Sequence, residues 1–180
     1  MSKALNLPNL LALFRIALAP LMLWFFIDRN NPIFSSWHPS WFDYFAGLIF
    51  VVASITDFFD GFIARSWNQM TKLGGILDPL ADKMLVLAGF IGLIVINRAS
   101  AWAVFLVLSR EFFITGLRVV AVSEGKDVAS TMAGKIKTVV QMIAIGFLTM
   151  SWPFATELLW LAVILTIYSG YEYTRDYFKN

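Results

Sequence analysis

The chain contains no cysteine and few charged side chains. Without cysteine, a disulfide scaffold, a thiolate metal site and a catalytic thiol are all excluded. Only 14% of the 180 residues are charged, whereas about 25% is usual for a globular domain. Too few polar side chains remain to cover a surface that faces water, which argues against a soluble enzyme. A formal net charge of +2 is also too small for a protein that binds the phosphate backbone of nucleic acids.

What the chain has instead is apolar: 59% of its residues are hydrophobic, including 17 Phe and 7 Trp, and the mean hydropathy is +0.72. A transmembrane helix needs about 20 mostly apolar residues. Six segments are candidates for such helices, at residues 8–27, 41–62, 77–96, 101–122, 137–152 and 155–173. Because the connections are short and no residues remain for a second domain, we expect an all-α integral membrane protein with one six-helix domain over residues 1–180.

The basic residues predict how these helices are oriented. With six spans, both termini lie on one side of the membrane, and only Arg29 and Arg98 fall near the other side. The remaining twelve fall near the side of the termini: Lys3, Arg15, Arg65, Lys72, Lys83, Arg110, Arg118, Lys126, Lys135, Lys137, Arg175 and Lys179. Cytoplasmic segments carry an excess of Lys and Arg, so we expect both termini in the cytoplasm.

Four aspartates form a regular pattern at the cytoplasmic ends of the second and third spans. Asp57 and Asp60 are three residues apart and share one helix face, while Asp78 and Asp82 are four apart and share a face of the next helix. A charge at the centre of a membrane helix costs about 2.5–3.5 kcal/mol. The simplest alternative is therefore that these are helix-end charges facing water, but their spacing is too regular for that to be favoured.

The short linker predicts that the two helices are antiparallel neighbours, which brings the four carboxylates together. Converging like charges repel each other and need cations to neutralise them. Without cysteine or a nearby histidine the ligands are all oxygen, which favours Mg²⁺, Mn²⁺ or Ca²⁺ over Zn²⁺. Four carboxylates could hold two such ions.

Small and basic residues surround this pattern. Gly61 and Ala64 continue the face of the first aspartate pair, and either close helix packing or space for a ligand would explain them equally well. Four basic residues fall near the same side of the membrane and could bind a phosphate group. They are Arg110, Arg118, Lys135 and Lys137. Alternatively, the lysines only mark the cytoplasmic side, and Arg110 pairs with Glu111 or an aspartate.

The pattern Asp57-x2-Asp60-Gly61-x2-Ala64-Arg65-x8-Gly74-x3-Asp78-x3-Asp82 resembles the signature of the CDP-alcohol phosphotransferases, with every defining position present. The resemblance implies a six-helix membrane enzyme, usually a homodimer, that moves a substituted phosphate from a CDP-linked donor to an alcohol and releases CMP.

The resemblance also implies roles for individual residues. Asp57, Asp60, Asp78 and Asp82 would bind Mg²⁺ or Mn²⁺, two ions in all, and Asp82 would also be the catalytic base. The CDP moiety of the donor would bind at Asp60, Gly61, Ala64, Arg65 and Gly74.

Three further segments resemble the bacterial branch of the family that uses CDP-diacylglycerol as donor and sn-glycerol 3-phosphate as acceptor. They run from Leu7 to Ile16, from Arg110 to Arg118 and from Gly134 to Thr138, with Ala12 as a departure where the family often has Thr. This implies that the acceptor phosphate meets Arg110, Arg118, Lys135 and Lys137, and that the enzyme lies in the bacterial cytoplasmic membrane with its site facing the cytoplasm.

Two alternatives stay open at this point. The acceptor could instead be inositol phosphate, phosphatidylglycerol or serine. The aspartates could also belong to a divalent-cation channel or transporter, although residues 47–53 and 88–96, on the opposite half of the same helices, are almost wholly apolar and argue against a pore.

Overall fold

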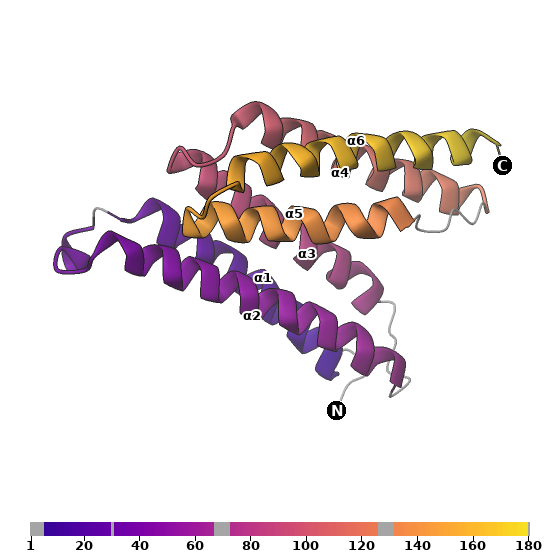
Figure 1. Ribbon diagram of the computed structural model, residues 1–180. Helices are drawn as coiled ribbons and strands as arrows, with labels where there is room; N and C mark the ends of the chain where they lie inside the picture. Colours follow the sequence, from indigo (N-terminus) through magenta and orange to yellow (C-terminus); the bar gives the residue numbers. More distant parts are fainter. Residues whose placement is uncertain (1–5, 30, 67–72, 126–131, 180) are drawn as a thin grey trace. The chain divides into compact units, whose positions relative to one another are not determined.

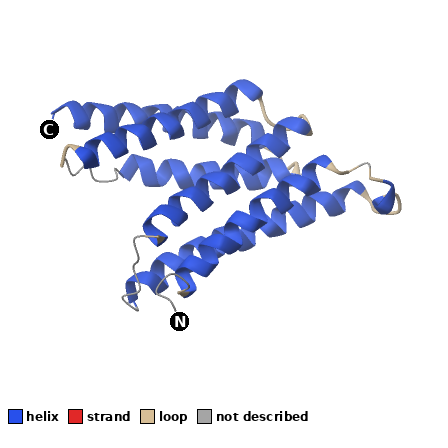
Figure 2. Ribbon diagram, turned by 180° about the vertical axis from the view of Figure 1, so that it is seen from behind, coloured by secondary structure: helices blue, strands red, loops and turns tan. Residues whose placement is uncertain are grey.

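The computed structural model describes residues 6–29, 31–66, 73–125 and 132–179, and the side chains at positions 33 and 58–66 lie outside the description. Within these residues the backbone forms helices and no strand (Figure 2). The elements are α1 (Leu7–Ile27), the 3₁₀-helix η1 (Pro32–Phe34), α2 (Pro39–Ser66), α3 (Gly74–Val95), α4 (Ala101–Ser123), α5 (Met132–Met150) and α6 (Ala155–Lys179) (Figure 1). The described chain is therefore all-α with six α-helices, as the sequence predicts.

The helices group into two compact units. The first, Met1–Ile96, contains α1 to α3, and the second, Asn97–Asn180, contains α4 to α6. In the first unit α1 packs along both α2 and α3, whereas α2 and α3 contact each other over a much shorter stretch. The predicted contact between α2 and α3 is thus present, and among the described residues α1 is the helix along which both of them pack.

Small residues on α1 explain this arrangement. Its buried face repeats every three or four residues and includes Ala12 and Ala19, which are almost completely buried. Ala46 of α2 and Ala81 of α3 are likewise fully buried. Small side chains let helix backbones approach closely, which is the usual basis of helix packing in membranes.

Local sequence signals determine where α1 begins. Asn6 is the N-cap, and its side chain accepts a hydrogen bond of 3.1 Å from the backbone N–H of Asn9. Pro8 lies in the first turn, where its missing N–H costs nothing.

The two basic residues predicted on the side away from the termini both have local partners. Arg29 follows α1 and forms an ion pair with Asp43 of α2. Arg98 donates a 2.5 Å hydrogen bond to the carbonyl of Thr149, near the C-terminus of α5, where helix carbonyls lack helical partners. Each guanidinium is thus accommodated by a nearby acceptor within its own unit.

In the second unit, α6 packs along both α5 and α4. The Tyr177 hydroxyl, near the end of α6, lies 3.0 Å from a carboxylate oxygen of Glu124, which follows α4, and donates a hydrogen bond to it. This contact raises the pKa of Tyr177, because the negative carboxylate accepts a hydrogen bond only from the neutral phenol.

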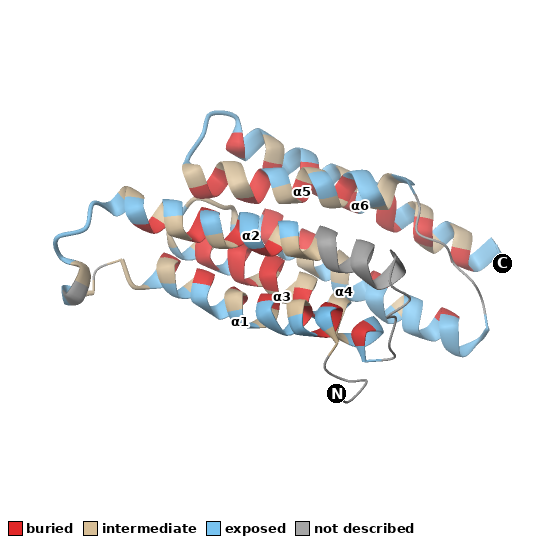
Figure 3. Ribbon diagram, turned by 90° about the horizontal axis from the view of Figure 1, so that it is seen from below, coloured by how far each residue is buried: buried red, intermediate tan, exposed pale blue. Residues whose placement is uncertain are grey.

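Much of the described surface is apolar, and buried and exposed positions alternate along the helices (Figure 3). Large exposed hydrophobic side chains occur in both units, among them Leu48, Phe105 and Ile164, and Trp41, Trp102 and Trp152 are exposed near helix ends. In the described chain three segments are long and apolar enough to cross a membrane, Leu7–Ile27, Pro39–Asp57 and Met132–Met150. These features are typical of a protein that is solvated by lipid.

The packing of α1 on α3 gives a testable prediction at Gly92. A Cβ atom at this position would lie 2.6 Å from Cγ and 2.8 Å from Cβ of Phe26, which is itself 1% exposed. Because the Phe26 Cβ cannot swing away from its backbone, Gly92→Ala is expected to lower the free energy of unfolding by about 1–3 kcal/mol. Thermal unfolding of the purified protein in detergent measures this change.

Gly146 in α5 is the matched control, because a Cβ there meets no described atom within 4 Å. Gly146→Ala should leave stability unchanged or raise it by up to about 1 kcal/mol. Equal effects of the two substitutions would contradict the packing of Gly92 against Phe26.

Candidate active site

Two acidic residues of the motif meet a buried arginine in the first unit. Arg15 lies in the middle of α1 and its side chain is 0% exposed. One guanidinium nitrogen, Nη1, forms an ion pair with Asp57 of α2, and the other, Nη2, lies 3.6 Å from Oδ1 of Asp78 in α3. Arg15 therefore joins the two helices that carry the acidic motif.

The other acidic residues are placed less completely. Asp82 lies one turn beyond Asp78 on α3 and is partly buried, and Gly74 is buried at the first position of the same helix. The backbone of α2 continues to Ser66. The side chains of four predicted site residues on that stretch lie outside the described residues: Asp60, Gly61, Ala64 and Arg65.

This part of the first unit fits a divalent cation. Among the described residues, no three acidic or histidine side chains are close enough together to form a metal site. However, Asp57 and Asp78 approach one point from two helices, and Oδ1 of Asp78 is buried without a hydrogen-bond partner in the described structure. Nη2 of Arg15 lies 3.6 Å from this oxygen, too far for a hydrogen bond, so the oxygen can still accept a donor or a metal ion. Oxygen ligands are those that Mg²⁺ and Mn²⁺ prefer.

The second unit brings predicted cations together around a glutamate. Lys137 of α5 is buried and forms an ion pair with Glu111 of α4. The neighbouring Arg110 places Nη1 3.4 Å from the same carboxylate oxygen. Arg110 thus makes the pair with Glu111 that the sequence offered as the alternative to phosphate binding, and Glu111 is shared by two cations.

Arg110 also connects α4 to α6. Its Nη2 donates a 2.9 Å hydrogen bond to the hydroxyl of Ser169, which is fully buried. A Cβ atom at Gly170 would lie only 3.1 Å from Cγ of Arg110, so the glycine leaves space for the arginine stem. The Nε of Arg110 is buried without a hydrogen-bond partner among the described residues, so the guanidinium retains a free donor.

The other two predicted cations are at the surface of this unit. Arg118 is exposed, and its guanidinium carbon lies 5.8 Å from the centre of the Tyr173 ring, within the range of a cation–π contact. Lys135 is exposed, whereas Lys137 is buried. Residues that are two positions apart on a helix lie on different faces. The structure therefore gives different environments to two lysines for which the sequence predicts the same role.

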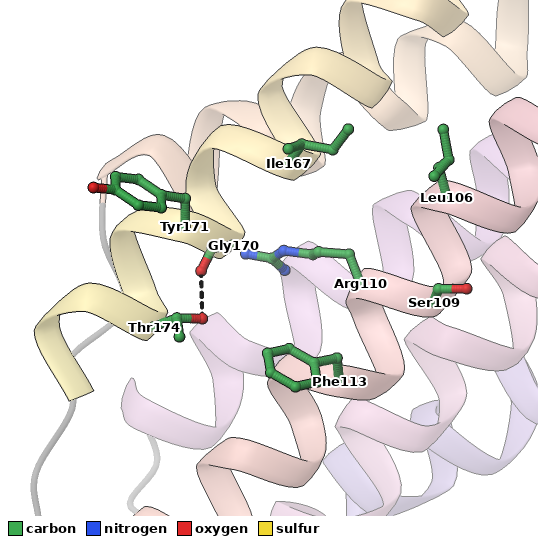
Figure 4. A pocket seen from close by; sticks show the side chains of 8 residues that line it. All are labelled: Leu106, Ser109, Arg110, Phe113, Ile167, Gly170, Tyr171 and Thr174. Carbon is green, nitrogen blue, oxygen red and sulfur yellow. Dashed lines mark hydrogen bonds between the residues drawn. The ribbon is translucent and has the colours of Figure 1, made fainter. Parts of the chain in front are cut away.

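A cleft of about 570 Å³ lies between α4 and α6, and Arg110 reaches across it towards Gly170 (Figure 4). The residues that line it are Leu106, Ser109, Arg110, Phe113, Ile167, Gly170, Tyr171 and Thr174. Its lining is mostly apolar and includes one guanidinium, so the cleft offers a cation beside an apolar surface.

Sequence reasoning assigned no role to several residues at these sites. Arg15 had a detectable signal, because it is a charged residue within an otherwise apolar segment. Glu111 was considered only as an alternative partner of Arg110. Ser169 and Tyr173 had none, because a hydroxyl in an apolar helix looks the same whether it contacts an arginine or a backbone carbonyl.

Comparison with known proteins places the chain in a family. Residues 5–168 match the family model described as CDP-alcohol phosphatidyltransferase. A relative from Bacillus subtilis (strain 168), named CDP-diacylglycerol–glycerol-3-phosphate 3-phosphatidyltransferase, is 41% identical over 93% of this chain and 93% of its own length. A relative of the same name from Escherichia coli (strain K12) is 38% identical over 93% of this chain and 92% of its own length. With the acidic motif and the match over most of its length, the chain belongs to the CDP-alcohol phosphatidyltransferase family.

Proposed function

We propose that this protein transfers the phosphatidyl group of CDP-diacylglycerol to sn-glycerol 3-phosphate, giving phosphatidylglycerophosphate and CMP. The observation that carries the proposal is the similarity to relatives named for this reaction, at 41% and 38% identity over 93% of the chain. The complete acidic motif, with Asp57, Asp60, Asp78 and Asp82 at family spacing, supports the transfer from a CDP-linked donor.

The donor would bind at the acidic motif. Asp57, Asp60, Asp78 and Asp82 would hold Mg²⁺ or Mn²⁺, two ions in all, and these would neutralise the donor pyrophosphate and stabilise the CMP leaving group. The CDP moiety would bind along residues that offer small side chains or charge, namely Asp60, Gly61, Ala64, Arg65 and Gly74.

Asp82 would serve as the general base. Its carboxylate takes the proton of the acceptor hydroxyl, and the hydroxyl oxygen forms a bond to the phosphorus of the phosphatidyl group. The bond between that phosphorus and the oxygen of CMP breaks, and CMP leaves with the electron pair. Asp82 suits this role because it lies furthest along α3 among the motif carboxylates.

The acceptor phosphate would be bound by Arg110, Arg118, Lys135 and Lys137. Two of these cations already surround Glu111, and Arg110 keeps a buried Nε without a partner in the described structure. A phosphate offers several acceptor oxygens and pairs well with a guanidinium fork. We further propose that residues 1–180 act as one catalytic domain, since the family match covers parts of both units.

The remaining features of the proposal concern the membrane. The chain would cross the bacterial cytoplasmic membrane six times, with both termini and the active site on the cytoplasmic side, and would form a homodimer. The distribution of Lys and Arg supports the orientation, and the apolar helices support the membrane location.

An acceptor panel tests the proposed reaction. Purified protein with Mg²⁺ or Mn²⁺ and CDP-diacylglycerol is expected to release CMP when sn-glycerol 3-phosphate is added, because the relatives are named for this acceptor and its phosphate can pair with the cation cluster. Inositol phosphate, phosphatidylglycerol and serine are the comparison acceptors. Equal CMP release without any acceptor, or faster release with another member of the panel, would overturn the acceptor assignment.

A further inference from the structure

We infer that Arg15 is a positioning residue that holds Asp57 and Asp78 at the separation needed to bind divalent metal ions. The inference rests on the proposed function, because it concerns the same carboxylates. It adds a residue from a helix that lies outside the acidic motif altogether.

The packing of the first unit shows why such a residue is needed. Asp57 is on α2 and Asp78 is on α3, and these two helices contact each other much less than each contacts α1. Two carboxylates that approach one another repel, so without a link they would separate. In the part of the chain that the structure describes, the guanidinium of Arg15, on the shared helix, contacts both carboxylates.

The burial of Arg15 supports a specific role. It is the one charged residue in α1, and it is 0% exposed in a helix whose other buried members are mostly apolar. A buried charge is costly unless it is paired. The trio of Arg15, Asp57 and Asp78 keeps one net negative charge, so it is stabilised in part by the arginine and still attracts a cation.

The geometry requires an arginine. Its Nη1 meets Asp57 and its Nη2 approaches Asp78 at 3.6 Å, so two different nitrogens serve two different helices. The guanidinium is a rigid planar fork, whereas a lysine is a single point charge on a flexible stem. Lysine at this position would keep the charge and lose the link.

Arg15→Lys therefore separates positioning from charge. Substituting a residue that orients metal ligands typically costs about 10–100-fold in affinity, so we expect Arg15→Lys to weaken binding of Mn²⁺ at least about tenfold. The measurement is electron paramagnetic resonance of free Mn²⁺ with the full-length protein and no substrates. Arg29→Lys is the matched control, because Arg29, which follows α1, also pairs with an aspartate of α2, at the other end of the helices. It should bind Mn²⁺ as the wild type does. Thermal unfolding without metal checks that both variants are folded.

Arg15→Gln is the second variant. If Arg15 merely repelled metal ions, removing its charge would tighten Mn²⁺ binding, whereas loss of positioning weakens it. Wild-type affinity in Arg15→Lys, or tighter binding in Arg15→Gln, would overturn the inference. So would failure of both variants to fold, since Arg15 would then be a requirement for folding.

The same measurement distinguishes this inference from the proposed reaction. If the wild-type protein binds no Mn²⁺, the proposed metal site fails and the inference fails with it. If it binds Mn²⁺ and loses affinity in Arg15→Lys, yet releases no CMP with any acceptor, the proposed reaction fails and the role of Arg15 stands.

Discussion

Asp82→Asn is expected to abolish CMP release while the protein still folds. Asparagine has nearly the same shape as aspartate, but its amide can neither take the proton of the acceptor hydroxyl nor offer a negative charge to a metal ion. Loss of a general base alone lowers a rate by about 10²–10⁴-fold. Because Asp82 is also a proposed metal ligand, the loss should lie at the upper end of that range or beyond it. The measurement is kcat for CMP release with saturating CDP-diacylglycerol and sn-glycerol 3-phosphate.

Asp43→Asn provides the comparison for this experiment. Asp43 is also a partly buried aspartate of the first unit, and its partner is Arg29, far along α2 from the acidic motif. Its substitution removes a carboxylate and an ion pair without touching the proposed site, so the rate per folded molecule should be that of the wild type. Near-normal turnover in Asp82→Asn would remove Asp82 as the base.

Lys137→Ala is expected to destabilise the second unit and to weaken the use of the acceptor at the same time. The Lys137 side chain is 6% exposed and pairs with Glu111, which is 17% exposed. Removing one partner of a buried pair leaves the other charge uncompensated, which costs about 3–5 kcal/mol. Arg110 lies 3.4 Å from Glu111 and offsets part of this cost, so a loss of about 3 kcal/mol is expected. The KM for sn-glycerol 3-phosphate should rise in the protein that remains folded.

Lys135→Ala separates these two effects. Lys135 is exposed on another face of α5, so its removal should leave thermal stability unchanged and only raise the KM for the acceptor. In a double-mutant cycle, Lys137→Ala combined with Glu111→Ala should be less destabilising than the sum of the single changes, because neither charge is then left alone. Additive effects, or equal stability loss in the two lysine variants, would contradict the buried pair.

The second unit illustrates where sequence reasoning stops. Spacing alone places Arg110 and Arg118 about two helical turns apart on one face, and both do contact α6, through Ser169 and Tyr173. Spacing cannot identify those partners, because they come from a segment about 60 residues away in the chain. The sequence offers Glu111 as one possible partner of Arg110, but spacing cannot show that Arg110 is half-buried in this pair while Arg118 is exposed.

The sequence by itself indicated that lipid surrounds this protein, that its chain is helical, and that it carries the acidic motif. Scarcity of charge and long apolar runs identify a lipid-solvated all-α chain, because composition and periodicity are local properties. The acidic motif was complete in the sequence because all its members lie within 26 positions of two adjacent helices.

The tertiary structure alone decided which charges meet. Packing of α1 against both α2 and α3 joins Arg15 to Asp57 and Asp78, and the rotation of α5 turns Lys137 inwards and Lys135 outwards. These contacts depend on which helix faces pack against each other. That packing is determined by small residues and other side chains that are distant from one another in the sequence. A charge in an apolar interior is stable only next to a partner, and tertiary packing decides which residue that partner is. The spacing of residues along one helix does not specify residues on another helix.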